Sequence, residues 1–112
     1  MTAVPTSIYF VQTNAVGGED EEFNHWYDTV HIPEILQIPG FVAAQRFEFD
    51  AEATTAQAPD YRYLAVYEVE GSGADAAAAL RRAIPLLQMS ETLDASRSLV
   101  LYRAITDRIV AP

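Results

Sequence analysis

The chain has 112 residues, half of them hydrophobic, which is enough for one domain with a core but not for two. Its 16 acidic residues against 7 basic ones give a net charge of −9, which disfavours nucleic acids and anionic membranes as partners and favours a neutral or weakly polar small molecule. The absence of cysteine excludes disulfides, thiolate nucleophiles and thiolate metal sites, and the absence of lysine excludes a lysine Schiff base.

No apolar run approaches the roughly 18 residues that a membrane-spanning helix needs. The first residues also lack the basic and then apolar regions of a signal peptide. We therefore expect a cytoplasmic protein that forms a single domain over residues 1–112.

The first half of the chain predicts a strand, a helix and a second strand. Residues Ser7 to Thr13 are β-branched and aromatic, and the acidic run Glu19 to Glu22 suits the positive end of a helix dipole. We expect that helix to end near His31 or Ile32, because Pro33 disfavours the helical conformation of the residue before it. Pro39-Gly40 predicts a turn, and the second strand should run from Phe41 to Phe49.

The second half predicts a strand, a helix and a last strand. Asp50 to Asp60 has the composition of a hairpin loop, and Tyr61 to Glu70 that of a strand. A helix is predicted over Asp75 to Ala83, with Asp75 as a possible N-cap and Pro85 interrupting it. The last strand should span Ser96 to Thr106, while the segment from Leu86 to Leu93 is irregular or a short second helical piece.

This order of elements, β-α-β-β-α-β, predicts an α+β ferredoxin-like fold in which two helices cover one face of a four-stranded antiparallel sheet. Both faces of the predicted strands are apolar: Leu64 and Val66 lie opposite Tyr63, Ala65 and Tyr67. Two helices cover only one face, so the second apolar face needs a partner. We expect a homodimer whose two sheets pack into a barrel.

The helix carries both histidines of the chain on different faces. At about 100° per residue, Phe23, Trp26, Tyr27 and Val30 form the apolar stripe, and His31 borders it beside Tyr27. His25 falls on the opposite, solvent side, so the two histidines cannot share a metal ion, and we expect no metal site.

His31 is the candidate acid or base. It lies in the last helical turn, where the dipole and the nearby Asp28 favour the imidazolium, while burial favours the neutral ring, so that a pKa near neutrality is plausible. A structural role, bonding the last helix carbonyls, fits the spacing equally well. Asp28 is a possible orienting group, since residues three apart are neighbours on a helix, or else an acid facing solvent.

Four further residues are candidates for contact with a ligand. Asn24 lies on the His31 side of the helix, and Tyr27 lies beside His31. The hydroxyls of Tyr63 and Tyr67 could donate to a developing oxyanion, or the two rings could pack across strands in a dimer core. Arg46, a charge in the middle of a strand, needs either a salt bridge, to Glu48 or Glu68, or an anionic substrate oxygen.

The stretch FNHWYDTVHIPEILQIPGFVAAQRFEF resembles the first helix and second strand of the dimeric α/β-barrel superfamily, closest to its small EthD-like proteins. YRYLAVYEVE and SLVLYRAI resemble its third and last strands. The matching positions are Phe23, Asn24, Trp26, Tyr27, Asp28, His31, Pro33, Glu34, Pro39, Gly40, Phe41, Arg46 and Phe47. The resemblance implies a homodimer with a pocket between helices and sheet, in which His31 is the acid or base. The second helix region, Ala76 to Ala79 followed by Pro85, is more broken than the family pattern, so the resemblance does not define the far wall of the pocket or the identity of the substrate.

We therefore expect a cofactor-independent enzyme of the isomerase, cyclase or dehydratase type acting on an aromatic or polyketide-like compound. The candidate catalytic residues are His31, Asp28 and Tyr67, and the candidate substrate-binding residues are Asn24, Tyr27, Tyr63 and Arg46. Two alternatives use the same barrel: a monooxygenase, either cofactor-free or with heme ligated by His31, and a non-catalytic ligand-binding module.

Overall fold

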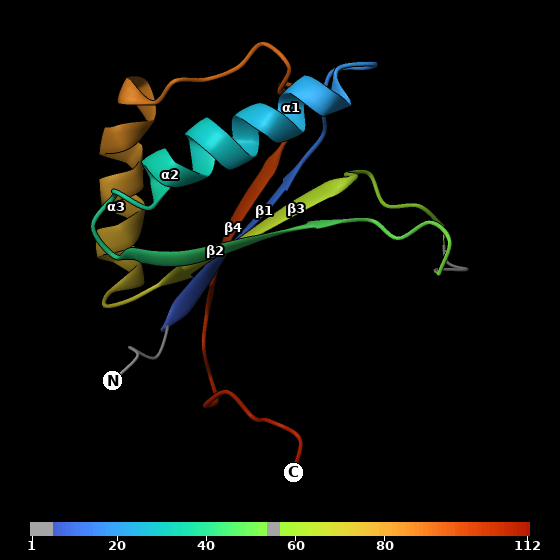
Figure 1. Ribbon diagram of the computed structural model, residues 1–112. Helices are drawn as coiled ribbons and strands as arrows, with labels where there is room; N and C mark the ends of the chain where they lie inside the picture. Colours follow the sequence, from blue (N-terminus) through green and yellow to red (C-terminus); the bar gives the residue numbers. More distant parts are fainter. Residues whose placement is uncertain (1–5, 54–56) are drawn as a thin grey trace.

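A computed structural model describes residues 6–53 and 57–112 of the chain. Strands β1 (Ser7–Thr13), β2 (Phe41–Glu48), β3 (Tyr63–Val69) and β4 (Ser98–Arg103) form one antiparallel sheet in the order β2-β3-β1-β4. Helices α1 (Asp20–Trp26), α2 (Ile32–Ile35) and α3 (Gly73–Ala83) lie on one face of this sheet (Figure 1). The predicted α+β ferredoxin-like fold is confirmed.

Alternation along the strands divides the sheet into two apolar faces, as the sequence predicted. On the helix side, Tyr9 of β1 and Tyr63, Ala65, Tyr67 and Val69 of β3 are buried. They pack against Phe23, Tyr27, Ile35, Ala76, Ala79 and Leu80 of the helices. This single layer of contacts between helices and sheet is the core.

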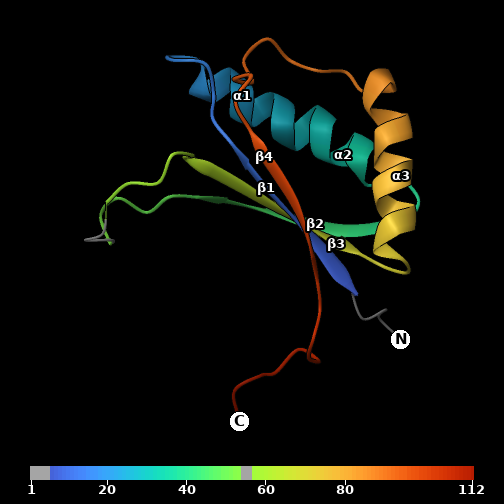
Figure 2. The same cartoon turned by 180° about the vertical axis from the view of Figure 1, so that it is seen from behind.

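The opposite face of the sheet is uncovered. Ile8, Phe10, Leu64 and Val66 are half-buried there, and Val100 and Tyr102 of β4 are exposed. The segment that follows β4 leaves the sheet on this same side, away from the helices (Figure 2). A wide apolar surface on one side of a sheet is the surface that a partner sheet would cover.

The histidine-bearing helix does not end at His31 or Ile32, as the sequence predicted. After α1 the chain makes one π-helical turn over Tyr27–His31, in which the Ile32 N–H donates to the Tyr27 carbonyl five residues back, and continues as α2. Pro33 lies in the first turn of α2, where a missing N–H and a fixed φ are tolerated.

The π turn also changes which residues face the core. On a straight α-helix, residues four apart are rotated by about 40° relative to one another around the helix axis. The wider π turn compensates for this rotation. Phe23, Tyr27 and Ile35, spaced in multiples of four, are therefore all buried. Val30, predicted to lie in the stripe, is not among the core residues, so that part of the prediction was wrong.

The remaining element boundaries differ from the prediction by a few residues. The first strand is confirmed, and the other three are shorter than predicted at their ends. The N-cap of α3 is Ser72, whose hydroxyl accepts from the Asp75 N–H, so Asp75 is not the cap. The helix is followed by a 3₁₀ turn at Ile84–Leu86, which contains Pro85. Of the predicted hairpin loop Asp50 to Asp60, residues 54–56 lie outside the described part of the chain.

Candidate functional site

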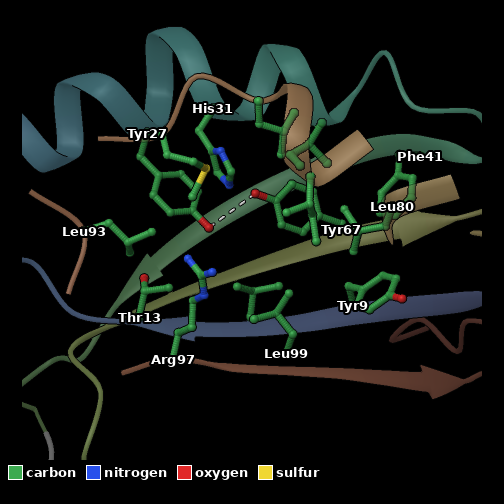
Figure 3. Close-up of a pocket in the computed structure, with 15 residues that line it drawn as sticks. Tyr9, Thr13, Tyr27, His31, Phe41, Tyr67, Leu80, Leu93, Arg97 and Leu99 are labelled. Atoms are coloured by element: carbon green, nitrogen blue, oxygen red, sulfur yellow. Dashed lines mark hydrogen bonds between the residues drawn. The ribbon is translucent and has the colours of Figure 1, made fainter. Parts of the chain in front are cut away.

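A cavity lies between the buried face of the sheet and the helices, roofed by the turn at Ile84–Leu86 and the segment that follows it (Figure 3). The space open to the centre of a water molecule is about 70 Å³, and the hollow measures about 590 Å³ when all empty space out to its mouth is counted. Most of the wall is aliphatic or aromatic. The polar side chains on it belong to Thr13, Tyr9, Tyr27, His31, Tyr67 and Arg97.

His31 is held in the wall of the cavity by two aromatic rings. Its imidazole stacks on Trp26 with ring centroids 4.7 Å apart, and it meets the edge of Tyr27 at 4.8 Å. Trp26 is itself fixed by a hydrogen bond from its Nε1 to the Gln88 carbonyl, 2.8 Å long. The His31 ring points into the cavity (Figure 3), and its buried Nδ1 has no hydrogen-bond partner among the described residues.

Burial makes His31 neutral. Loss of hydration lowers the pKa of His31 to about 4, because the charged form is disfavoured away from water. Glu34 opposes this shift, whereas the positive charges of Arg97 and Arg46 add to it. The sequence left a pKa near neutrality plausible, and that expectation was wrong: desolvation of the ring outweighs the attraction of Glu34, and because the helix continues to Ile35, His31 does not lie in its last turn.

Tyr27 and Tyr67 bring their hydroxyls together at the cavity. Tyr67 Oη donates to Tyr27 Oη over 3.3 Å (Figure 3), and both rings are buried. Burial raises the pKa of each hydroxyl, so both stay protonated at neutral pH. Because the Tyr67 hydroxyl donates its proton to Tyr27 Oη, the hydroxyl proton of Tyr27 is available for a hydrogen bond to an acceptor in the cavity. Because Tyr67 is buried against Tyr27 of the helix, it lies on the face of the sheet that the helices cover and not in a dimer core.

Arg97, which the sequence analysis missed, also lines the cavity. It directly precedes β4, and its guanidinium points toward the two tyrosine hydroxyls (Figure 3). The sequence SRSLVLY gave a weak signal, a lone base at the start of a strand, but a strand end does not determine where a long side chain turns.

The other predicted residues form a second polar cluster, between the histidine-bearing helix and strands β2 and β3. Arg46 donates to Asp28 Oδ1 and to Asn24 Oδ1, each over 2.8 Å, and its guanidinium lies 4.4 Å from the centre of the Tyr27 ring. Tyr63 donates to Asp20 Oδ2 over 2.6 Å and accepts from Asn24 Nδ2 over 3.4 Å. These residues surround an open groove separate from the cavity.

This arrangement changes the roles expected from the sequence. Arg46 has the expected salt bridge, but with Asp28, because a bulge after Phe41 and the pleat of β2 direct it toward the helix. The Asp28 carboxylate is therefore engaged by Arg46, and no described hydrogen bond joins it to His31. His25 is exposed, as predicted from helical phase.

Neither cluster has the composition of a metal centre. Within residues 6–53 and 57–112, no group of three or more histidine and carboxylate side chains is placed to hold a metal ion. In the same part of the chain, no helix is both long and apolar enough to cross a membrane.

Solved structures share this fold at low sequence identity. One is a candidate monooxygenase from Shewanella loihica PV-4, 20% identical, with a TM-score of 0.57 over 94% of this chain and 99% of that one. A second is the heme-degrader MhuD from Mycobacterium tuberculosis, with two hemes bound in its active site, 18% identical, with a TM-score of 0.63 over 91% and 98%. A third is an EthD family protein from Bacillus halodurans C-125, 10% identical, with a TM-score of 0.53 over 88% and 99%.

No protein-family model matches the sequence, and no curated protein matches it significantly. At these identities, the likeness to solved structures shows the fold and not the reaction.

Proposed function

Because the chain has the ferredoxin-like fold that dimeric α/β-barrel proteins share, we propose that its cavity is an active site. In this proposal the protein is a cofactor-independent enzyme of the isomerase, cyclase or dehydratase type, and its substrate is a small aromatic or polyketide-like carbonyl compound. One observation carries the proposal: the neutral imidazole of His31 and the paired hydroxyls of Tyr27 and Tyr67 line the same apolar cavity. A base and a hydrogen-bond donor on one small cavity are the parts that proton transfer next to a carbonyl requires.

The proposed chemistry begins with removal of a proton from carbon. A ring nitrogen of His31 takes the proton from the carbon next to the carbonyl, and the C–H electron pair becomes the C=C bond of an enolate. The carbonyl oxygen gains the negative charge and accepts a hydrogen bond from Tyr27, which Tyr67 polarises. His31 then returns the proton to another carbon, for isomerisation, or to a leaving hydroxyl, for dehydration.

The low pKa of His31 keeps its ring free to accept a proton at neutral pH, but it also makes the resting imidazole a weaker base than an exposed one. At neutral pH the ring is wholly in its basic form, since its pKa is about 4. Negative charge developing on the substrate stabilises the imidazolium as it forms, so the base strengthens during the reaction. The roles of the second cluster are indirect in this scheme: Asp28 and Asn24 hold Arg46, and Arg46 holds the ring of Tyr27.

Heme is the second candidate ligand, favoured by the unpartnered Nδ1 of His31 and by the fold shared with MhuD. The cavity, as its lining residues enclose it, does not fit a porphyrin. The space open to the centre of a water molecule is about 70 Å³, and the hollow of about 590 Å³ includes open solvent at its mouth, whereas a porphyrin is a rigid plane of linked rings. We therefore derive no step through heme.

We also propose that the protein is a homodimer. The uncovered face of the sheet carries Phe10, Leu64, Val66, Val100 and Tyr102, all apolar or aromatic. Phe10 and Tyr102 pack edge to face there, with centroids 6.0 Å apart. A second copy of the same sheet would cover this surface and close the barrel that the sequence predicts.

The experiment that tests the proposed chemistry is deuterium exchange of a model diketone. Benzoylacetone joins an aromatic ring to the repeating diketone unit of a polyketide, and NMR follows the loss of its central protons in heavy water. We expect the protein to accelerate exchange and the His31→Ala variant to lose about a hundredfold of that acceleration, the usual size of general-base catalysis. His25→Ala, on the exposed side of the helix, is the matched control and should match the wild type. No acceleration, or an active His31→Ala variant, contradicts the proposal; in the latter case the cavity is a binding site only.

A further inference from the structure

Arg97 is an exposed residue whose side chain lines an apolar cavity, and it forms no ion pair with a described acid. The chain has more than two acids for every base, and the ion pairs among the described residues use Arg46 and Arg62. Arg97 makes none of these pairs, and no described hydrogen bond uses its guanidinium. Arg81, Arg82, Arg103 and Arg108 also lack a described ion pair, so what distinguishes Arg97 is that it is the arginine that lines this cavity.

The position of Arg97 relates it to the proposed chemistry. It approaches the cavity from the start of β4, and its guanidinium points toward the hydroxyls of Tyr27 and Tyr67 (Figure 3). Its charge lowers the pKa of both His31 and Tyr27, which shows that its field reaches the polar groups of the cavity. The same field attracts an anion entering the cavity.

The rest of the cavity determines what kind of anion fits. The wall is mainly aliphatic and aromatic, including Leu80, Leu93 and Leu99, so the body of the ligand must be apolar. A guanidinium presents two parallel N–H donors, which match the two oxygens of a carboxylate.

We propose that Arg97 is a specificity-determining residue that binds a carboxylate of the substrate, so that the cavity accepts small aromatic acids in preference to neutral aromatic compounds. This inference rests on the proposed function and narrows its substrate class. It also reverses, for this cavity, the expectation of a neutral ligand that follows from the net charge of −9.

The test compares two probes of the same shape that differ in charge. Benzoate carries a carboxylate that is ionised at neutral pH, and benzamide is its uncharged analogue. Binding is measured by calorimetry and by the fluorescence of Trp26, the only tryptophan, which contacts His31 in the cavity wall. We expect benzoate to bind the wild type at least tenfold more tightly than benzamide, with an advantage that shrinks as salt is added.

The Arg97→Gln variant should lose the preference for benzoate and keep its affinity for benzamide. Arg97→Lys should show part of the preference that Arg97→Gln loses, since lysine keeps the positive charge but lacks the two parallel N–H donors of the guanidinium. Arg82→Gln is the matched control, because Arg82 is exposed on α3 and does not line the cavity. Equal affinity of the wild type for both probes, or an unchanged preference in Arg97→Gln, overturns the inference and leaves the proposed function standing. If neither probe binds the wild type, the inference is overturned, and the exchange of benzoylacetone then decides the proposed function by itself.

Discussion

The imidazole of His31 lies on the indole of Trp26, with ring centroids 4.7 Å apart and planes inclined by 27°. This stacking fixes the one imidazole that faces the cavity and places the only tryptophan of the chain beside it. The protonation of His31 is therefore visible in the emission of Trp26.

The first prediction uses this contact to measure the pKa of His31. An imidazolium quenches a neighbouring indole more strongly than a neutral imidazole does. Because burial lowers the pKa of His31 to about 4, Trp26 emission should stay constant from neutral pH downward and fall with a midpoint near that value. The His31→Gln variant should lack the transition, with circular dichroism confirming that it remains folded. A midpoint near the ordinary value of about 6.5 would show that the ring is hydrated.

Much of the fold was predictable because it depends on local patterns. The β-branched and aromatic residues of Ser7–Thr13 predicted the first strand, and the acidic run Glu19 to Glu22 predicted the start of the helix. Pro33 led to a wrong prediction of the helix end, because a proline is tolerated in the first turn of a helical segment and α2 begins one residue before it. The residues of the π turn carry no local pattern that predicts this turn.

The site was less predictable, because it depends on where long side chains turn. Helical phase placed His31 near the core, but its pKa depends on burial that only packing determines. Arg46 reaches Asp28 across two elements, which sequence spacing does not reveal. Arg97 comes from a strand end 66 positions after His31 (97 − 31) and joins the cavity through tertiary structure alone.

The second prediction concerns Arg46, whose side chain is only 14% exposed. Arg46→Met removes an ion pair, a hydrogen bond to Asn24 and the contact with the Tyr27 ring. We expect the free energy of unfolding in urea to fall by about 2 kcal/mol, since partners are left unpaired in a half-buried cluster. Arg62→Met is the matched control: its side chain is 57% exposed, and because water screens its ion pairs with Asp20 and Glu48, the free energy of unfolding should stay close to that of the wild type. Equal losses in the two variants would refute this account of Arg46.

The third prediction tests the homodimer. Val66 lies in the centre of the uncovered sheet face, opposite Phe10 in the register of β1 and β3. Sedimentation of the wild type at micromolar concentration should give a dimer, and Val66→Asp should give a folded monomer, because a carboxylate would be buried without a partner. Gln37→Asp, at an exposed position after α2, should leave the dimer intact. A monomeric wild type would contradict the proposed homodimer and its barrel.

The fourth prediction separates heme from smaller ligands. Hemin added to the purified protein should give no shifted Soret band, because the enclosed part of the cavity, with about 70 Å³ open to the centre of a water molecule, is too small for the macrocycle. A stoichiometric Soret shift that is lost in His31→Ala would show instead that His31 is an axial ligand and that the roof of the cavity opens.

The central claim, that His31 acts as a base of low pKa inside the cavity, is tested most directly by the pH profile of benzoylacetone exchange. After subtraction of the reaction without protein, the rate constant should rise with a midpoint near pH 4 and then stay level to neutral pH, as neutral His31 replaces its protonated form. His31→Ala should show neither the rise nor the plateau, while His25→Ala should show both. The claim would be contradicted by the same profile in His31→Ala, or by a wild-type midpoint near that of an exposed histidine, about 6.5.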